Sequence, residues 1–212
     1  MEATQKTKGI ILRRENFLEN NSRVFVYTRD FGKVSLVARG TAKLTSKLSG
    51  HIEPLNLCDI MIVKGKQYDY VGSCVSENIF VEVKKNYDKI FICGTAVNLV
   101  DDIIKGQEKD ERIFLMLKKF LEILNAAGDD ARIANLQLVK TAFALKLITM
   151  LGYEPKLNMR SLGAVRVNKN LADFLSVLLR VKFDEIIKIN CSDVLAKEAA
   201  EAILAYKLYI FD

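Results

Sequence analysis

The hydrophobic pattern of this chain changes its period near residue 80, and that change constrains the fold more than any other feature. Before it, apolar and polar side chains alternate, as they do in half-buried β-strands. After it, apolar side chains recur at i, i+3, i+4 and i+7, which is the spacing of one face of an α-helix. The sequence therefore predicts an α+β fold with two domains, residues 1–80 and residues 81–212.

The first domain contains five short segments with the composition of β-strands. In the clearest of them, Val24, Val26 and Thr28 point to one face and Phe25 and Tyr27 to the other, the alternation of a strand that has one face in a core. The expected strands are Gly9–Arg14, Ser22–Arg29, Lys33–Arg39, Asn56–Val63 and Lys66–Val75. Five such strands with turn signals between them predict a small barrel or a sandwich.

The second domain contains five segments with helical spacing. They are Asn86–Lys105, Asp110–Ala126, Asp129–Leu151, Leu171–Arg180 and Ser192–Tyr209. Gly152 and Pro155 follow the third segment and predict its end, and Ser192 is a suitable N-cap for the last one. We therefore expect an all-helical C-terminal domain.

Charge favours an anionic partner for the first domain. The chain has a formal net charge of +6; residues 1–80 hold 12 Lys and Arg against 8 Asp and Glu, and residues 81–212 hold 20 against 18. A basic excess favours nucleic acid or an anionic membrane, although many basic proteins bind neither. No stretch reaches the roughly 18 consecutive apolar residues of a membrane span, and the N-terminus does not have the pattern of a signal peptide. We expect a cytoplasmic protein without a membrane partner.

Residues that commonly carry catalysis or bind metals are sparse. Cys58, Cys74, Cys93 and Cys191 are scattered singly, without the C-x-x-C pairs of a zinc site, so we expect them to be small core residues. His51 is the single histidine, and a lone histidine is usually structural. We therefore expect no enzymatic activity, no bound metal and no cofactor.

One segment of the first domain has the composition of a phosphate-binding loop. The strand that ends at Arg39 is followed by a stretch rich in Ser and Thr, which carries Lys43 and Lys47 and is closed by Gly50 and Pro54. Such a loop, rooted on a rigid strand, can place cations and hydroxyl donors against a phosphate backbone. The alternative is an ordinary solvated loop, and the residues alone favour neither.

The order of these pieces resembles the RecO family of bacterial repair proteins. That family begins with a strand of the type G-I-V-L-R, followed by a G-K-V turn, a V-A-R-G stretch, basic and Ser residues, a Gly and a Pro. The corresponding residues here are Gly9–Arg13, Gly32–Val34, Val37–Gly40, Lys43, Ser46–Leu48, Gly50 and Pro54. Later the family has a helix that ends in L-G-Y-x-P, and Leu151–Pro155 has that sequence here. The joint order and spacing over most of the chain carry the resemblance.

The resemblance implies an N-terminal five-stranded OB-fold barrel that binds nucleic acid, followed by a helical domain that binds partners. OB barrels bind single strands through a basic groove and stacking aromatic side chains. The family anneals complementary single strands of DNA, works with RecR and helps to load the RecA recombinase. Its helical domain holds the acidic, hydrophobic C-terminal tail of the single-stranded-DNA-binding protein. We expect single-stranded DNA, RecR and that tail as partners.

Basic residues of the first domain are the expected DNA contacts, with the role of neutralising phosphates rather than reading bases. They are Arg39, Lys43, Lys47, Arg13, Arg14, Lys33 and Arg23. The candidates for base stacking are the aromatic residues Tyr27, Phe31, Tyr68 and Tyr70. Packing in the core of a small barrel is the commoner role of such residues, and it is the alternative here.

Two departures from the family limit what the resemblance implies. Many members carry four zinc cysteines after the L-G-Y-x-P motif, whereas the segment after that motif has none here, so no zinc is expected. Members also tend to have the pattern R-x-F-E on the preceding helix, where this chain has Thr141 and Ala144 in place of Arg and Glu. The expected contacts to the acidic tail are therefore Phe143 with Lys140 or Lys146. The alternative for the apolar stripe of this helix is a place in the core.

Two other functions are compatible with the sequence. A protein–protein adaptor would keep the barrel and its charges, and would dock an acidic partner without annealing DNA. An enzyme using Cys58 or His51 would need a base and a nucleophile in contact.

Overall fold

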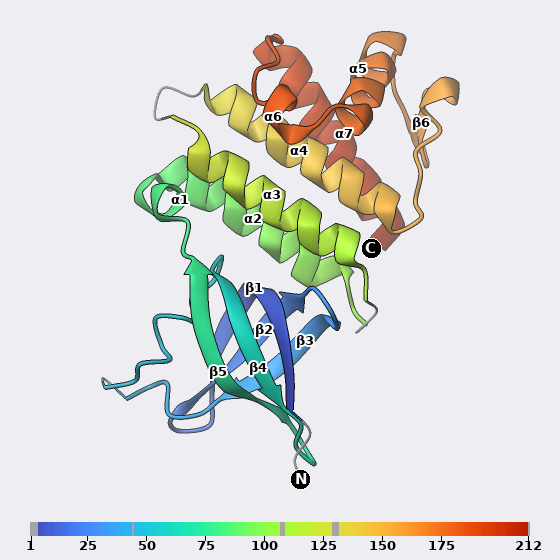
Figure 1. The fold of residues 1–212 in the computed structure, drawn as a ribbon. Coiled ribbons are helices and arrows are strands. Elements are labelled where there is room, and N and C mark those ends of the chain that lie inside the picture. The colour runs from blue at the N-terminus through green and yellow to red at the C-terminus, as the bar shows by residue number, and fades with distance from the viewer. Residues whose placement is uncertain (1–3, 44, 107–108, 129–131, 212) are drawn as a thin grey trace.

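The computed structural model describes residues 4–43, 45–106, 109–128 and 132–211, and in it a strand-rich part is followed by a helical part (Figure 1). The first part consists of β1 (Thr4–Phe17), β2 (Asn21–Thr28), β3 (Gly32–Ala38), β4 (Leu57–Val63) and β5 (Asp69–Asn78). These strands form a closed barrel in the order β1-β2-β3-β5-β4, with β3 and β5 parallel. This is the expected five-stranded OB-fold, and the sandwich alternative is wrong.

Strand alternation fills the interior of the barrel with apolar side chains. Val24 and Val26 of β2 share one face, as their spacing predicts; that face points into the barrel, and both side chains are fully buried. Gly9 of β1 pairs with Thr28 on one side and with Cys58 on the other. A Cβ at residue 9 would lie 2.5 Å from the Val26 side chain, so the barrel can close at this point only around a glycine.

The second part is helical. Its helices are α1 (Val81–Lys85), α2 (Tyr87–Ile103), α3 (Glu111–Ala126), α4 (Ile133–Met150), α5 (Lys169–Arg180), α6 (Phe183–Ile186) and α7 (Asp193–Phe211). The five expected helices are confirmed, apart from the expected start of the third at residues 129–131, which lies outside the described residues. Ser192 is confirmed as an N-cap, because its Oγ accepts the N–H of Leu195 at 3.2 Å.

Four short elements of this part were not expected from the sequence. They are α1, α6, a 3-10 turn (Leu157–Met159) and a hairpin of β6 (Ser161–Leu162) and β7 (Val165–Arg166). The two-residue strands are too short to show any period, and α1 and α6 span little more than one helical turn, so periodicity could not have found them.

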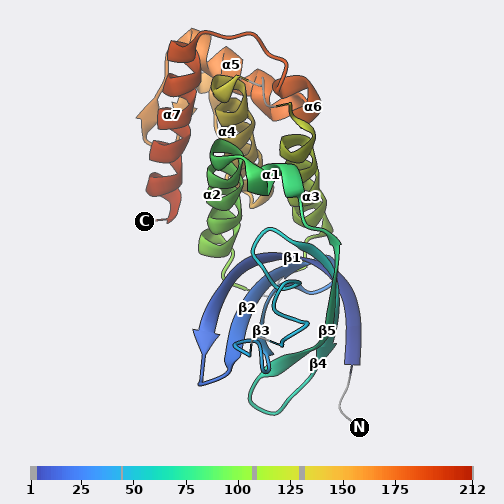
Figure 2. The ribbon, with the colours of Figure 1, turned by 90° about the vertical axis from the view of Figure 1, so that its left-hand side faces the viewer.

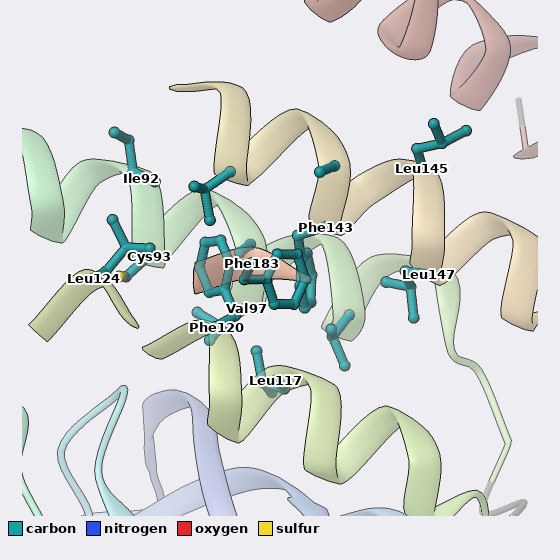
Figure 3. Packing of buried hydrophobic residues seen from close by; sticks show 14 of the residues in the cluster. Ile92, Cys93, Val97, Leu117, Phe120, Leu124, Phe143, Leu145, Leu147 and Phe183 are labelled. Carbon is teal, nitrogen blue, oxygen red and sulfur yellow. The ribbon is translucent and has the colours of Figure 1, made fainter. Parts of the chain in front are cut away.

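Helices α2 and α3 lie between the barrel and helices α4–α7, and α1 packs beside them (Figures 1 and 2). The centre of the helical part is an aromatic cluster, in which the ring centroid of Phe120 lies 4.7 Å from that of Phe143 and 5.9 Å from that of Phe183 (Figure 3). Helix α4 is long and apolar enough, by length and composition, to cross a membrane, and half of that stretch is buried inside the protein. A core helix has the same composition.

The barrel and the helices share one continuous core. Ile10, Leu12 and Tyr27 from the outer face of the barrel belong to the same buried cluster as the helical side chains. Tyr27 is completely buried, and its hydroxyl donates to the carbonyl oxygen of Asp110 at 3.2 Å. Burial, with the negative charge of Asp110, raises the pKa of Tyr27 to about 12. Tyr27 therefore belongs to the core, and its candidacy for base stacking is wrong.

Candidate nucleic-acid interface

Two arginines lie against aromatic rings on one side of the barrel. The guanidinium carbon of Arg39 lies 4.0 Å from the centroid of the Tyr70 ring, and that of Arg23 lies 4.1 Å from the centroid of Phe17. Tyr68 meets Phe17 edge to face, with their centroids 5.3 Å apart. We name these five residues the aromatic–arginine patch. Arg39 is exposed and the other four are half-buried, so the rings are partly open to solvent.

Strand pairing brings the patch together. Arg23 pairs with Val37 of β3, and Val37 pairs in turn with Tyr70 of β5. Directly paired residues point to the same face of a sheet, so Arg23 and Tyr70 flank the buried Val37 on the outside of the barrel. Cations and π-faces side by side are what sequence-tolerant binding of single strands requires.

The basic loop, the segment between β3 and β4 that carries Lys43 and Lys47, begins at Arg39, which is itself a member of this patch. The Gly40 N–H donates to Asn21 Oδ1 at 3.0 Å, which ties the start of the loop to the β1–β2 turn. Arg39, Lys43 and Lys47 are exposed, and within the described part of the chain none of them forms an ion pair. Their charge is therefore available to an anionic ligand.

Arg13 and Lys33, two of the expected DNA contacts, lie instead at the junction with the helices. Arg13 Nε lies 2.9 Å from Asp101 Oδ2, and Lys33 Nζ lies 2.6 Å from Asp101 Oδ1. Burial alone would raise the pKa of Asp101, but hydrogen bonds from Lys33 and Arg13 outweigh it and hold that pKa below its usual value. This arrangement gives both cations a structural role, and their contact with DNA stays a prediction.

The other two expected contacts also have acidic neighbours. Arg14 Nη1 donates to Glu53 Oε1 at 2.5 Å and to the carbonyl oxygen of Ser49 at 3.3 Å. Arg23 Nη1 lies 3.9 Å from Glu15 Oε1. The structure thus brings Arg23 and Arg39 together on one face of the barrel, with Lys43 and Lys47 on the loop that follows, and ties Arg14 to the far end of the same loop.

Phe17 is the member of the patch that the sequence did not suggest. It lies at the end of β1, beyond the expected strand, and only the continuation of that strand to residue 17 could have indicated it. Phe31, a stacking candidate, instead packs against the interior cluster of the barrel.

A groove of about 480 Å³ lies between α2, α4 and α7. Lys140 and Phe143 line it from α4, and Leu204 and Lys207 line it from α7. Lys140 is half-buried and has no hydrogen-bond or ion-pair partner within the described residues. Burial lowers the pKa of Lys140, because an ammonium group in an apolar wall loses its hydration.

Lys146 does not face this groove. Its Nζ donates to the carbonyl oxygen of Leu179 at 2.5 Å and lies 5.9 Å from the ring centroid of Phe183. Burial lowers the pKa of Lys146 as well. The structure therefore brings Lys140 and Phe143 together and separates Lys146 from them.

Cys58 and His51, the two residues of the enzyme alternative, contact each other through the His51 backbone and not through its imidazole ring. The Cys58 thiol donates to the carbonyl oxygen of His51 at 3.2 Å, whereas the imidazole Nδ1 accepts the N–H of Ser76 at 3.1 Å. The Nδ1 side of the ring is thus held by β5, and no hydrogen bond joins the imidazole to the Cys58 thiol within the described residues.

Two family models match the chain in order: Recombination protein O N terminal over residues 1–80, and Recombination protein O C terminal over residues 84–163. The chain belongs to the RecO family. The first RecO model ends at residue 80, between β5 and α1, and the second begins at residue 84, within α1.

Curated relatives agree with this family. A DNA repair protein RecO of Caldanaerobacter subterraneus subsp. tengcongensis is 23% identical over 228 residues, which cover 95% of this chain and 90% of the relative. One of Caldicellulosiruptor bescii is 28% identical over 70% of this chain and 58% of the relative, and one of Roseiflexus sp. is 31% identical over 72% and 51%. The last two matches span less than two thirds of the relatives' length. This RecO family member functions in DNA repair and recombination.

Proposed function

We propose that the chain binds single-stranded DNA on the barrel, over the aromatic–arginine patch and the basic loop. The observation that carries this proposal is the stacking of Arg39 on Tyr70, followed along the chain by Lys43 and Lys47; none of these three cations forms an ion pair within the described residues. A cation and a π-face side by side suit a phosphate and the adjacent unpaired base. A duplex hides the faces of its bases, so the patch favours single strands.

Strand annealing follows from the same chemistry. Two single strands repel each other through their phosphates, and cations that neutralise part of that charge lower the barrier to their meeting. Half-buried rings hold bases without reading them, so a bound strand keeps its pairing edges free. We propose that the chain accelerates annealing in this way, acts with RecR in loading RecA, and carries out no covalent chemistry.

The groove between α2, α4 and α7 is the proposed site for the acidic tail of the single-stranded-DNA-binding protein. Such a tail offers carboxylates and apolar side chains. Lys140 supplies a desolvated ammonium without a partner in the described structure, and Leu99 and Leu204 supply apolar walls, whereas Phe143 is fully buried. Thr141 and Ala144 also line the groove, so it lacks the Arg and Glu of the family pattern. Its cations are Lys140 and Lys207, and Asp102 and Glu201 line it as well.

Fluorescence anisotropy with labelled oligo-dT tests the DNA site. The triple variant Arg39→Glu/Lys43→Glu/Lys47→Glu is compared with Lys119→Glu/Lys182→Glu/Lys188→Glu, which changes the net charge equally at exposed lysines of the helical part. If the patch and loop contact about five phosphates, the wild-type log–log salt slope is about −3.5, and loss of three contacts brings it to about −1.4. Equal affinity and equal slope for the two folded variants would refute the DNA site and favour a protein–protein adaptor.

A further inference from the structure

The segment between the L-G-Y-x-P motif and α5 carries positive charge without any negative charge. Residues 155–172 contain no Asp or Glu and four cations, which are Lys156, Arg160, Arg166 and Lys169. All four are exposed, and within the described residues none forms an ion pair. The nearest acidic residues along the chain, Glu154 and Asp173, lie just outside the segment.

The backbone of the β6–β7 hairpin is anchored; Arg166 lies in this hairpin and Arg160 directly precedes it. Leu162 is fully buried and belongs to the core of the helical part. Gly163 lies against the ring of Tyr209 on α7, so closely that a side chain at residue 163 would collide with that ring. The N–H of Val167 donates to the carbonyl oxygen of Arg160 at 3.0 Å. The hairpin is therefore a fixed platform rather than a solvated loop.

The backbone around the hairpin adds to the positive potential. Lys169 is the first residue of α5, whose N-cap Asn168 accepts the N–H of Leu171 at 2.8 Å, and the first turn of this twelve-residue helix has no acidic residue. The positive end of the helix dipole thus adds to the charge of the side chains. Arg160 occupies the left-handed region, with φ 53°, at the corner where the chain enters β6.

This surface is separate from the barrel. Figures 1 and 2 both place the hairpin beyond α2 and α3, at the end of the molecule away from the strands of the barrel. A ligand on the hairpin would therefore leave the aromatic–arginine patch open to another.

We propose that the hairpin cations bind the phosphate backbone of a second nucleic-acid strand while the barrel holds the first. The proposal rests on the proposed function of the barrel and extends it, because a second strand held on the same protein would meet the first at a high effective concentration. Arg160 and Arg166 supply guanidinium groups, whose planar donors match phosphate oxygens. Insertion into a membrane would need an apolar face beside the charges, and Met159 is the one large exposed apolar side chain in residues 155–172.

The test compares a hairpin variant, Lys156→Gln/Arg160→Asn/Arg166→Gln, with a control of equal charge, Lys119→Gln/Lys182→Gln/Lys188→Gln. Asn is chosen at residue 160 because it tolerates positive φ. Each protein is loaded at low density on a short biotinylated oligo-dT held on beads, and capture of a second, fluorescent oligo-dT is then measured. The two strands cannot pair with each other, so capture requires two sites. Binding to vesicles that contain phosphatidylserine is measured in parallel.

We expect wild type and control to capture the second strand, with an affinity that falls on the order of 20-fold between 50 and 200 mM salt for three phosphate contacts. The affinity of the hairpin variant for the first strand should stay within about two-fold of wild type. Its affinity for the second strand should fall at least about ten-fold, as three lost contacts imply. Capture by the hairpin variant equal to that of the control overturns the second site. The second site is also overturned if the hairpin variant, but not the control, loses vesicle binding while its capture of the second strand is unchanged. Failure of wild type to stay on the first strand refutes the barrel site as well, whereas retention without capture refutes the hairpin site alone.

Discussion

Lys33 of β3 and Asp101 of α2 are 68 positions apart in the sequence and form an ion pair 2.6 Å long. Arg13 of β1 reaches the other oxygen of the same carboxylate. The Asp101 side chain is 10% exposed and that of Lys33 is 15% exposed, so most of the hydration of these charges is lost. This ion-pair triad joins two strands of the barrel to the helix that covers them, and orients the barrel relative to the helical part.

Substitution Asp101→Asn should lower the free energy of unfolding by about 2 kcal/mol at pH 7, between the values of exposed and of fully buried pairs. The reason is that Lys33 and Arg13 would keep their charges without a counter-charge. Urea unfolding of the variant, with Asp102→Asn on the exposed neighbouring carboxylate as the control, measures this. A loss no larger than that of the control would contradict the triad.

The same substitution should have a pH dependence of defined sign. The pKa of Asp101 is lowered in the folded state, because the hydrogen bonds from Lys33 and Arg13 outweigh burial. The stabilisation is therefore fully present above the unfolded-state pKa of about 3.9 and is lost as the pH falls through the lower folded-state value. The difference between wild type and Asp101→Asn should be constant from about pH 6 to pH 8 and should shrink below about pH 4. If the stability difference between wild type and Asp101→Asn grew as the pH fell, the lowered pKa of Asp101 in the folded state would be contradicted.

The triad marks the limit of what the sequence could predict. Alternation correctly placed Val24 and Val26 on the same face of β2, and the structure shows that this face lines the barrel interior. The partner of Lys33 lies in the other domain, so nothing local distinguishes this lysine from Lys43, which is exposed. For the same reason Tyr27 could be assigned to the outer face of β2 but not to a core, because the helices that cover that face lie more than 50 residues further along the chain.

The candidate sites show the same limit. The V-A-R-G stretch and the loop after it identified Arg39, Lys43 and Lys47, which the structure leaves exposed. Both Lys140 and Lys146 flank Phe143 in the sequence, and only packing shows which of the two faces the groove. The local sequence pattern predicts helices, strands and charged segments, whereas long-range packing decides which charged side chains are open to a ligand.

Replacing Tyr70 by Leu should weaken binding of oligo-dT by roughly 5- to 150-fold, the range of one stacked base, while Tyr70→Phe should retain most of the affinity. The ring, and not its hydroxyl, supports Arg39 and would stack on a base. Tyr87→Leu, at a highly exposed tyrosine of α2, is the control, and anisotropy titration is the measurement. Equal loss for Tyr70→Leu and Tyr70→Phe would contradict stacking.

Lys140→Gln should reduce binding of a peptide with an acidic, hydrophobic C-terminus by about ten-fold or more, because a charge-assisted hydrogen bond is lost. It should not destabilise the fold, since burial lowers the pKa of Lys140 and its charge therefore opposes folding. Calorimetric titration with Lys105→Gln as the control measures the affinity. Unchanged affinity for Lys140→Gln would place the tail elsewhere.

Phe143→Ala should act on stability, with a loss of about 3–5 kcal/mol, because its fully buried ring packs on Phe120 and Phe183. Thermal or urea unfolding measures it. A stable variant with only weakened peptide binding would show that Phe143 serves the partner rather than the core.

Annealing of two complementary, fluorescently labelled single strands by the purified protein is the decisive measurement for the proposed DNA function. We expect fast annealing at low salt that fades as salt rises, and at least about ten-fold slower annealing by the variant Arg39→Glu/Lys43→Glu/Lys47→Glu than by the charge-matched helical control, as three lost phosphate contacts imply. No acceleration by folded wild-type protein at any salt concentration would contradict the annealing function and leave the adaptor as the better account of the barrel.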